Sequence, residues 1–460
     1  MIESVRNIFA IPELRKRLLF TFGLLAVYRI GCFIPTPGVD PQGLLELVQQ
    51  LQGSLFDFVN SFTGGSLKRV AVFSLGIMPY ITSSIVLQLL TVVVPYLEKL
   101  SKEGEIGRKK ITQYTRYGTV LVSIIQSTGI AIFLEKTTTP GGSPLVPSPG
   151  WGFRLMTILT LTTGCAFVMW LGEQISERGI GNGISLIIFG GIVVGLIPAV
   201  GNTIQRVREG QLQLITILLL CVFMLVVVAF IVYMERAQRR IPVQYAKRVV
   251  GRKVYGGQST YLPLRVNTGG VIPVIFASSV VMVPQTLGTV FQDGWIQQIT
   301  RQISWGQPLY YLIYFATIIF FSYFYVSIIF NPADVAENMR KHGGFIPGIR
   351  PGRKTSEYID RILTRLTAVG ALYLASVAIL PEFLLAGFNL AGLPFIGSTL
   401  ADFMPQWISQ GLGIQFYFGG TSLLIVVGVA MDFMQQVESQ LVMRNYEGFM
   451  KRGRVRGRRS

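Results

Sequence analysis

The feature that most constrains this chain is a series of ten apolar stretches, each long enough to cross a lipid bilayer. About 20 apolar residues in a helix cross the roughly 30 Å hydrocarbon core, whereas open strands would leave unpaired backbone polar groups in lipid. The stretches are Leu18–Ile34, Val70–Pro95, Thr115–Leu134, Phe153–Leu171, Ile184–Val200, Leu212–Met234, Gly269–Val290, Leu309–Phe330, Ile362–Leu385 and Ile414–Phe433. The sequence therefore predicts an all-α membrane protein with ten transmembrane helices.

The composition agrees with a membrane protein. Only 14% of the 460 residues are charged and 50% are hydrophobic, whereas about a quarter of the residues in a soluble domain are charged. So many large apolar residues also exclude intrinsic disorder. The cysteines Cys32, Cys165 and Cys221 all lie in apolar stretches, so we expect no disulfide framework. These features argue against a soluble enzyme.

The positions of the basic residues predict the orientation in the membrane, because Lys and Arg favour cytoplasmic loops. Of the 41 Lys and Arg residues, 33 fall in alternate segments between or beyond the predicted spans. Both termini are therefore expected in the cytoplasm, as an even number of spans requires. The net charge of +18 is then mainly an insertion signal, not the mark of a nucleic-acid-binding domain.

The ten spans divide into two halves of five. Because five is odd, two homologous halves inserted in succession would have opposite orientations, which is the arrangement called an inverted repeat. The expected organisation is a cytoplasmic N-terminal segment (1–17), an N-terminal half (18–209), a C-terminal half (210–434) and a basic cytoplasmic tail (435–460).

One segment between the first two spans breaks the pattern. Ser54–Arg69 mixes large apolar residues with charged ones and is too short to cross a bilayer. The pair Gly64 and Gly65 interrupts it, as expected for a short helix that enters from outside and turns back. Irregular backbone at membrane depth requires surrounding protein or a water-filled cavity. An ordinary external loop is the alternative.

Sequence motifs for catalysis are lacking. The only histidine is His342, no phosphate-binding GxxxxGK[ST] string occurs, and no serine lies in a GxSxG string. We therefore expect neither an enzyme nor a bound cofactor. An ion-coupled secondary transporter would also suit ten spans, but it usually needs facing carboxylates within the membrane. Charged residues are nearly absent from the predicted spans: Arg29 lies near the outer end of the first and Asp432 near the cytoplasmic end of the last, and facing carboxylates are missing from the sequence of the spans. An intramembrane protease or transferase would need a catalytic pair within the spans, and the sequence shows none.

Eight strings, spread in order over nearly the whole chain, resemble the SecY family, whose members form the central subunit of the Sec protein-conducting channel. They are Phe33–Asp40, Gly76–Val93, Glu103–Thr119, Leu171–Ser185, Ala246–Thr260, Gly270–Ser279, Gly343–Thr355 and Phe418–Phe433. The strings are similar to those of the bacterial or organellar branch. The resemblance implies two halves around a central hourglass pore in the plasma (inner) membrane or its organellar equivalent.

The resemblance also implies a ring of six apolar side chains at the narrowest point of the pore. By motif position they are Ile77, Ile81, Ile184, Ile188, Ile275 and Ile425. The first four form two pairs at i and i+4, which share one helix face, and β-branching keeps the side chains stiff. Motif position alone selects these residues, because a single isoleucine in a membrane helix ordinarily contacts lipid or the protein core.

Two further elements follow from the resemblance. A plug helix that closes the external side of the channel corresponds to residues Phe58, Val59, Asn60, Phe62, Gly64, Gly65 and Leu67. A lateral gate, which opens between spans two and three on one side and seven and eight on the other, would include Gln88 and Gln126. Hydrogen bonding between helices is the ordinary role of such amides.

The family's cytoplasmic loops dock the ribosome or the SecA motor. Here the corresponding basic residues are Arg240, Lys247, Arg248, Arg252, Lys253 and Arg350. The alternative for any one of them is a plain orientation signal. Arg350 is the strongest candidate, because flanking prolines and glycines favour a loop tip of defined shape.

The function that the resemblance implies is translocation of unfolded secretory proteins across the membrane and lateral release of transmembrane segments into lipid. The implied partners are the small membrane subunits SecE and SecG, the SecA ATPase, the ribosome with its RNA, signal peptides and nascent chains, and membrane lipids. The ion-coupled secondary transporter is the alternative function.

Overall fold

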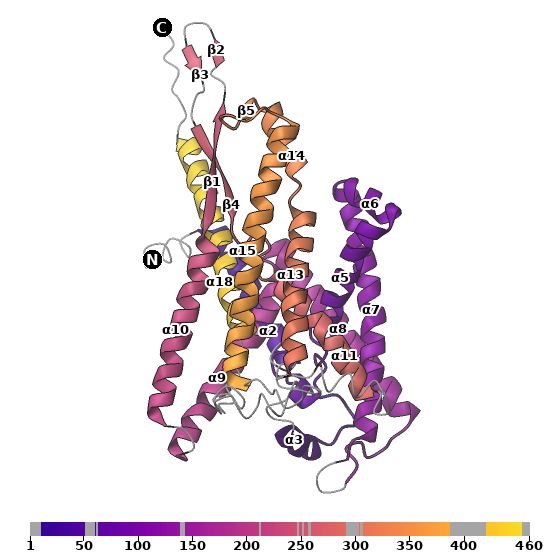
Figure 1. Cartoon of the computed structure of the whole chain (residues 1–460). Helices are drawn as coiled ribbons and strands as arrows, with labels where there is room; N and C mark the ends of the chain where they lie inside the picture. Colours follow the sequence, from indigo (N-terminus) through magenta and orange to yellow (C-terminus); the bar gives the residue numbers. More distant parts are fainter. Residues whose placement is uncertain are drawn as a thin grey trace. The chain divides into compact units, whose positions relative to one another are not determined.

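The computed structural model describes residues 11–50, 60, 63–138, 143–210, 213–245, 248–250, 253–255, 259–290, 303, 307–386 and 420–452 (Figure 1). The chain forms two compact units. Unit 1 comprises Met1–Arg208, Thr286–Ile296 and Val429–Ser460, and unit 2 comprises Glu209–Gln285 and Gln297–Gly428.

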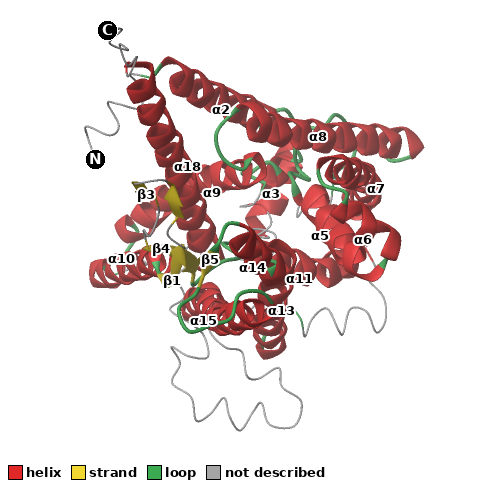
Figure 2. Ribbon diagram, turned by 90° about the horizontal axis from the view of Figure 1, so that it is seen from above, coloured by secondary structure: helices red, strands yellow, loops and turns green. Residues whose placement is uncertain are grey.

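Unit 1 is built from helices. They are α2 (Pro12–Gly31), α3 (Pro41–Gln50), the 3-10 turn η1 (Leu67–Arg69), α5 (Met78–Val93), α6 (Pro95–Lys102), α7 (Glu105–Lys136), α8 (Trp151–Arg178), α9 (Gly183–Arg208) and the part of α18 (Gly420–Arg452) that starts at Val429. Helix α7 packs against both α5 and α8, and α8 also contacts α2 and α9 (Figure 2).

Close packing of α7 follows from its sequence. The buried residues Thr115, Thr119, Ser123, Ser127 and Ala131 recur every four residues and place a stripe of small side chains along one face. Small residues let helix backbones approach closely in a membrane. The hydroxyls bond within the helix, as in the 2.7 Å hydrogen bond that Thr119 Oγ1 donates to the Thr115 carbonyl.

Unit 2 combines helices with strands. Its elements are α10 (Leu214–Arg236), β1 (Gln238–Tyr245), β2 (Arg248–Val250), β3 (Lys253–Tyr255), β4 (Ser259–Arg265), α11 (Ile272–Val290, up to Gln285), α13 (Pro308–Ile329), α14 (Pro332–Lys341), β5 (Gly344–Phe345), α15 (Arg353–Ala386) and the first part of α18, up to Gly428. Helix α13 packs against α15.

The strands correct the prediction of a purely helical chain. Antiparallel pairing of β1 with β4 runs from Gln238 opposite Arg265 to Gln244 opposite Ser259, and β5 completes a sheet in the order β4-β1-β5. Ile241 and Val243 are buried on one face of β1 while their neighbours are exposed. This alternation is the mark of a half-buried strand, but the many basic residues of the segment obscured it.

The membrane character is confirmed in outline. Each predicted stretch overlaps one helix: α2, α5, α7, α8, α9, α10, α11, α13, α15 and α18. Among the described residues, seven helices are long and apolar enough to cross a membrane, or up to eight if the bent pair α5 and α6 is one span. Ten spans therefore stay a prediction.

The second predicted span begins later than expected. Val70–Ile77 is not helical, since Val70 has a left-handed backbone with φ 44° and Gly76 has φ 54°. Helix α5 starts at Met78, and the chain bends by 99° where α6 begins at Pro95. Proline disfavours a helical conformation of the preceding residue, and Val94 is accordingly extended.

Candidate functional site

A buried turn lies within the predicted plug segment. We call Thr63–Ser66 the glycine turn, because Gly64 and Gly65 both have left-handed backbones, with φ 67° and 84°. The amide of Gly65 donates a 2.9 Å hydrogen bond to the carbonyl of Asn60, whose side-chain oxygen accepts a 3.0 Å bond from the amide of Lys68. The Ser66 hydroxyl, fully buried, lies 2.9 Å from the carbonyl of Phe73. The turn is therefore tied to the chain on both sides of it.

Three side chains, two on helix α2 and one directly after its last residue, contact two successive carbonyls of the glycine turn. Tyr28 Oη donates a 3.3 Å hydrogen bond to the Thr63 carbonyl, and Cys32 Sγ lies 3.9 Å from the same oxygen. Arg29 Nη1 donates a 2.5 Å bond to the Gly64 carbonyl. A positively charged donor makes this last bond the strongest of the three.

The turn is also closely packed. A Cβ atom added to Gly64 would lie 3.2 Å from Gly191 Cα on α9, and 3.4 Å from Tyr28 Oη. Tyr28 stacks on Phe73 with ring centroids 6.0 Å apart. A larger residue at Gly64 would be strained by the left-handed backbone and would also lie too close to Gly191.

Two arginines lie over one exposed ring beside the turn. The guanidinium carbons of Arg29 and Arg69 lie 4.6 and 4.2 Å from the ring centroid of Phe33. Both distances are within the range of a cation–π interaction. Only Arg29 of the two also bonds the glycine turn through its side chain.

The predicted plug residues are only partly described. Asn60 is 5% exposed, Gly64 is buried, and Gly65 and Leu67 are half-buried. Phe58, Val59 and Phe62 lie outside the described residues.

Four of the predicted ring isoleucines belong to unit 1. Ile77 and Ile81 are buried at the start of α5, and the Ile81 amide donates a 3.1 Å hydrogen bond to the Ile77 carbonyl. Ile77 therefore caps the helix while its partner lies one turn along. On α9, Ile188 is buried and Ile184 is half-buried, and a Cβ atom added to Gly172 of α8 would lie 3.4 Å from Ile184 Cγ1.

The other two ring isoleucines belong to unit 2. Ile275 on α11 is 4% exposed and Ile425 on α18 is fully buried. A Cβ atom on Gly428 would clash with the Val271 side chain, so α18 and the start of α11 approach closely at this point. Thus five of the six isoleucines are buried and none is exposed.

The two predicted lateral-gate amides lie on neighbouring helices of unit 1. Gln88, on α5, donates a 3.3 Å hydrogen bond from Nε2 to Ser84, while its Oε1 is buried without a hydrogen-bond partner among the described residues. Gln126 is half-buried on α7. The two helices are joined by Ser83, whose hydroxyl donates a 3.0 Å bond to the Thr115 carbonyl.

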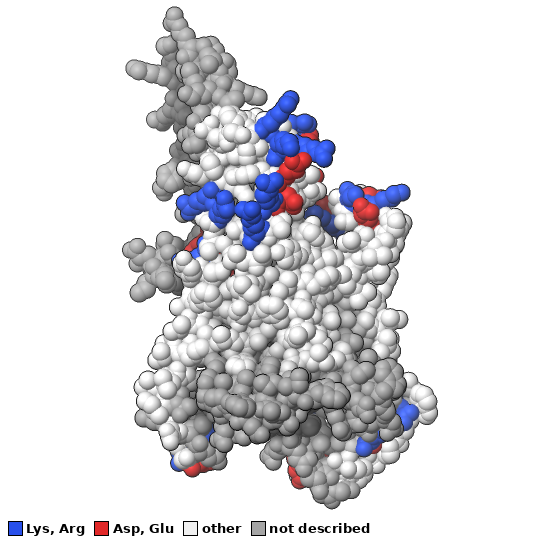
Figure 3. Space-filling model, in the orientation of Figure 1, with Lys and Arg blue, Asp and Glu red and all other residues white. Residues whose placement is uncertain are grey.

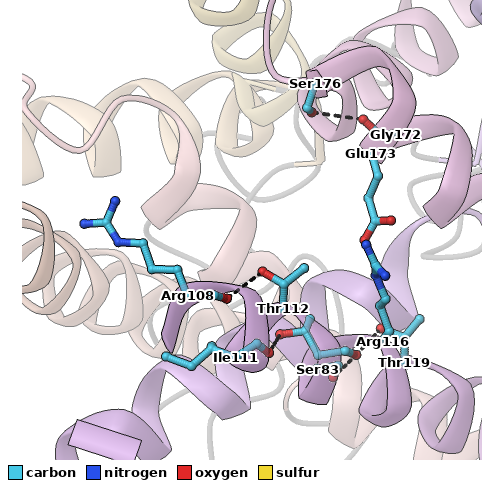
Figure 4. Close-up of polar contacts among 10 residues, drawn as sticks. Ser83, Arg108, Ile111, Thr112, Arg116, Thr119, Gly172, Glu173 and Ser176 are labelled. Atoms are coloured by element: carbon cyan, nitrogen blue, oxygen red, sulfur yellow. Dashed lines mark hydrogen bonds and ion pairs between the residues drawn. The ribbon is translucent and has the colours of Figure 1, made fainter. Parts of the chain in front are cut away.

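An ion pair that the sequence analysis missed joins α7 to α8. Arg116 Nε lies 2.8 Å from Glu173 Oε1, and the Glu173 side chain is only 14% exposed (Figure 4). The sequence does contain a signal for this pair. A basic residue lies at the start of one span and an acidic residue at the end of the next, and consecutive antiparallel helices bring those two ends together.

The predicted docking residues belong to unit 2. Arg240 is exposed on β1, and Arg350 is exposed between β5 and α15. Arg248 and Lys253 belong to the paired strands β2 and β3, whereas Lys247 and Arg252 lie outside the described residues. Basic side chains gather over the sheet and α14 (Figure 3).

Arg350 differs from the basic residues around it. Arg340 and Lys341 pair with Glu337, and Arg353 and Lys354 pair with Glu357. No carboxylate of the described residues lies within ion-pair distance of Arg350. The Thr355 hydroxyl donates a 3.0 Å hydrogen bond to the backbone carbonyl of Arg350. The backbone of Arg350 is therefore held in place, while its guanidinium stays available to a binding partner.

Comparison with known proteins decides the family. A family model named SecY matches residues 71–434. This chain belongs to the SecY family. It is 49% identical over 449 residues to the protein translocase subunit SecY of Escherichia coli strain K12, covering 97% of this chain and 96% of that one. The SecY subunit of Aquifex aeolicus is 42% identical over 453 residues, covering 98% and 100%.

Two solved structures share the fold of this chain. The structure described as a protein conducting channel has a TM-score of 0.63 at 18% identity and covers 92% of this chain and 91% of that one. Sec61 in the canine ribosome-channel complex has a TM-score of 0.60 at 18% identity, with the same coverage. The predicted family is thus confirmed, and the ion-coupled transporter is not favoured.

Proposed function

We propose that this chain is the pore subunit of a Sec-type channel, which moves unfolded secretory proteins across a membrane and releases apolar segments into lipid. Its near full-length identity to protein translocase subunits named SecY carries the proposal. The chain supplies a path, and the energy comes from a translating ribosome, a SecA-type ATPase or the membrane potential.

The proposed architecture has ten spans in two inverted halves, 18–209 and 210–434, with the segments 1–17 and 435–460 in the cytoplasm. The number of spans is supported by the helix that overlaps each predicted span. The basic residues of alternate loops support the orientation. Family membership suggests the plasma (inner) membrane or its organellar equivalent.

In the proposed pore, the six isoleucines form a collar at the narrowest point. A narrow apolar constriction excludes hydrated ions, because water leaves it. Rigid β-branched side chains keep the constriction defined, yet an extended polypeptide can push through by displacing them. Burial of five of the six supports this role, since residues that faced lipid would be exposed on the chain surface.

The proposed plug contains the glycine turn near its C-terminal end. Left-handed glycines provide a hinge that other residues do not, and the Arg29 bond to the Gly64 carbonyl holds this hinge against α2. Release of the bond would free the plug to leave the pore when a polypeptide enters.

The proposed lateral gate sorts segments by partitioning. Each Leu or Ile gains a few tenths of a kcal/mol on entering the membrane, so a stretch of about 20 such residues leaves the pore for lipid while a polar stretch continues across. Gln88 suits this position, because its buried unpaired oxygen is a polar group that a neighbouring helix can satisfy on closure.

The proposed docking surface consists of Arg240, Lys247, Arg248, Arg252, Lys253 and Arg350. Ribosomal RNA is a polyanion, so these residues would neutralise phosphates and make binding sensitive to salt. A solved relative of the same fold is named as part of a ribosome-channel complex. SecE, SecG and SecA are the other partners that family membership suggests.

Site-specific crosslinking of a stalled secretory chain tests the function directly. Photoreactive residues are placed at Ile81, Ile188 and Ile275 in the reconstituted complex, with Leu219 of α10, 62% exposed, as the control position. The three ring positions should crosslink to the stalled chain and Leu219 should not. Equal crosslinking at all four positions, or none at the ring, contradicts the proposal.

A further inference from the structure

The cytoplasmic hairpin of unit 2 has a closed base. The chain leaves α10 at Arg236, passes through β1 and β4, and returns to α11, which begins at Ile272. The Val266 amide donates a 3.0 Å hydrogen bond to the Ala237 carbonyl, next to the strand pair of Gln238 and Arg265. The residues that enter and leave the hairpin therefore lie side by side.

A buried polar pair spans this base, and we call it the base clasp. Asn267 Nδ2 donates a 2.6 Å hydrogen bond to Glu235 Oε1, at the end of α10, and a 3.1 Å bond to the Gly270 carbonyl. The exposed fractions are 5% for Asn267 and 8% for Glu235. An amide nitrogen has two hydrogens, so one side chain binds α10 and the segment that leads into α11.

The contacts beyond the clasp continue into α11. Gly270 has a left-handed backbone with φ 60°, and the Ile275 amide donates a 3.2 Å bond to the Val271 carbonyl in the first turn. Phe276 then packs edge-on against Phe321 of α13 at 5.7 Å. Asn267 therefore contacts Gly270, and the first turn of α11, which begins at Ile272, contains Ile275.

Helix α15 lies directly against the hairpin base. A Cβ atom on Gly370 would lie 2.6 Å from the Val266 carbonyl oxygen, so α15 is already in tight contact with the hairpin base. Beyond the other end of β1 and β4 lie β2 and β3, which carry Arg248 and Lys253 (Figure 1).

We propose that the Glu235–Asn267 clasp positions the start of α11 relative to the hairpin, so that a partner docked on the hairpin displaces the helix that carries Ile275. Both are positioning residues, since they act through α11 and not on the transported chain. The inference rests on the proposed function, because it assigns a gating role to the path between two of its sites.

The test compares N267D, E235Q and the double variant E235Q/N267D in the full complex, reconstituted in vesicles with a SecA-type motor. N267D places two carboxylates together, whereas the double variant restores a donor opposite an acceptor. T268A is the matched control, because Thr268 is half-buried at the same base and its hydroxyl donates a hydrogen bond to the Arg265 carbonyl instead.

The informative readout is precursor transported per ATP hydrolysed, measured beside motor binding. N267D should lower this ratio about tenfold, the scale of one lost charged hydrogen bond, with motor affinity unchanged. E235Q/N267D should recover most of the ratio, and T268A should match the unsubstituted chain. If N267D does not assemble, N267A replaces it in the test. N267A removes the hydrogen-bond donor without adding a second carboxylate beside Glu235, and it should lower the transport ratio by the same amount.

An unchanged ratio in N267D and N267A, or a double variant no better than N267D, overturns the clasp. A loss of motor binding in parallel with transport also overturns it, since that result assigns the residues to docking. If the unsubstituted complex itself transports no precursor, the proposed function fails instead.

Discussion

Substitution of Arg29 should open the idle channel, because its guanidinium is the strongest tie between α2 and the glycine turn. The bond to the Gly64 carbonyl is 2.5 Å long and has a charged donor. Such bonds contribute about 1.5–3 kcal/mol, and about 1.4 kcal/mol changes an equilibrium tenfold. Arg29 is half-buried, so the lower end applies. We expect Arg29→Met to raise the open fraction of the plug about tenfold.

The other two ties predict a graded series. Tyr28 makes a neutral bond of 3.3 Å, and its loss in Tyr28→Phe should cost about 1 kcal/mol, or about fivefold in the open fraction. Cys32 lies 3.9 Å from its acceptor and its thiol is a weak donor, so Cys32→Ala should change little. Arg29→Lys keeps the charge without the planar fork and should fall between Arg29→Met and the unsubstituted chain.

The assay is potassium efflux from vesicles that contain the reconstituted complex and no precursor. Arg69→Met is the matched control, because Arg69 shares the Phe33 ring contact but makes no side-chain bond to the glycine turn. Leak that is equal in Arg29→Met and Arg69→Met, or greatest in Cys32→Ala, refutes the reasoning. Thermal unfolding of each purified complex separates a freed plug from a misfolded chain.

Three further predictions concern other parts of the chain. Ile425→Asn adds a polar amide to the proposed collar and should raise ion conductance in planar bilayers; conductance equal to that of the unsubstituted chain counts against the collar. Arg350→Glu should reduce motor-driven transport at least tenfold with assembly intact. Arg353→Glu should have a small effect, because Arg353 makes only an exposed ion pair with Glu357. Equal effects of the two substitutions contradict the special role of Arg350. Glu173→Gln leaves the Arg116 charge without its partner and should lower the unfolding temperature of the complex by a few degrees, measured by calorimetry, and an unchanged temperature is the contrary result.

The helices could be predicted well from the sequence, because apolar length is a one-dimensional property. Each predicted span overlaps a helix, although Val70–Ile77 is not helical. The strand β1 was missed for a different reason. Its alternation is limited to Ile241 and Val243, and the strand contains Pro242, which cannot donate to a ladder. Pairing with β4, more than ten residues further along the chain, is a tertiary event that no local pattern indicates.

The predicted ring residues and the proposed positioning residues differ in how far a sequence can identify them. An apolar ring is a set of side chains, and family motifs select its members directly. Several contacts of the positioning residues end on backbone carbonyls, as in Arg29 on Gly64, Asn267 on Gly270 and Ser83 on Thr115. Every residue has a backbone carbonyl, so the identity of the accepting residue cannot be predicted from its amino-acid type.

Changing the residue that supplies a carbonyl leaves the acceptor in place, so only the donor side chain can be removed cleanly. Gly64 is an exception, because a side chain there would disturb the left-handed turn and the contact with Gly191 at once. Gly64→Ala should therefore displace the turn whether or not the Arg29 bond matters, and only the donor series of Arg29, Tyr28 and Cys32 isolates the hydrogen bonds.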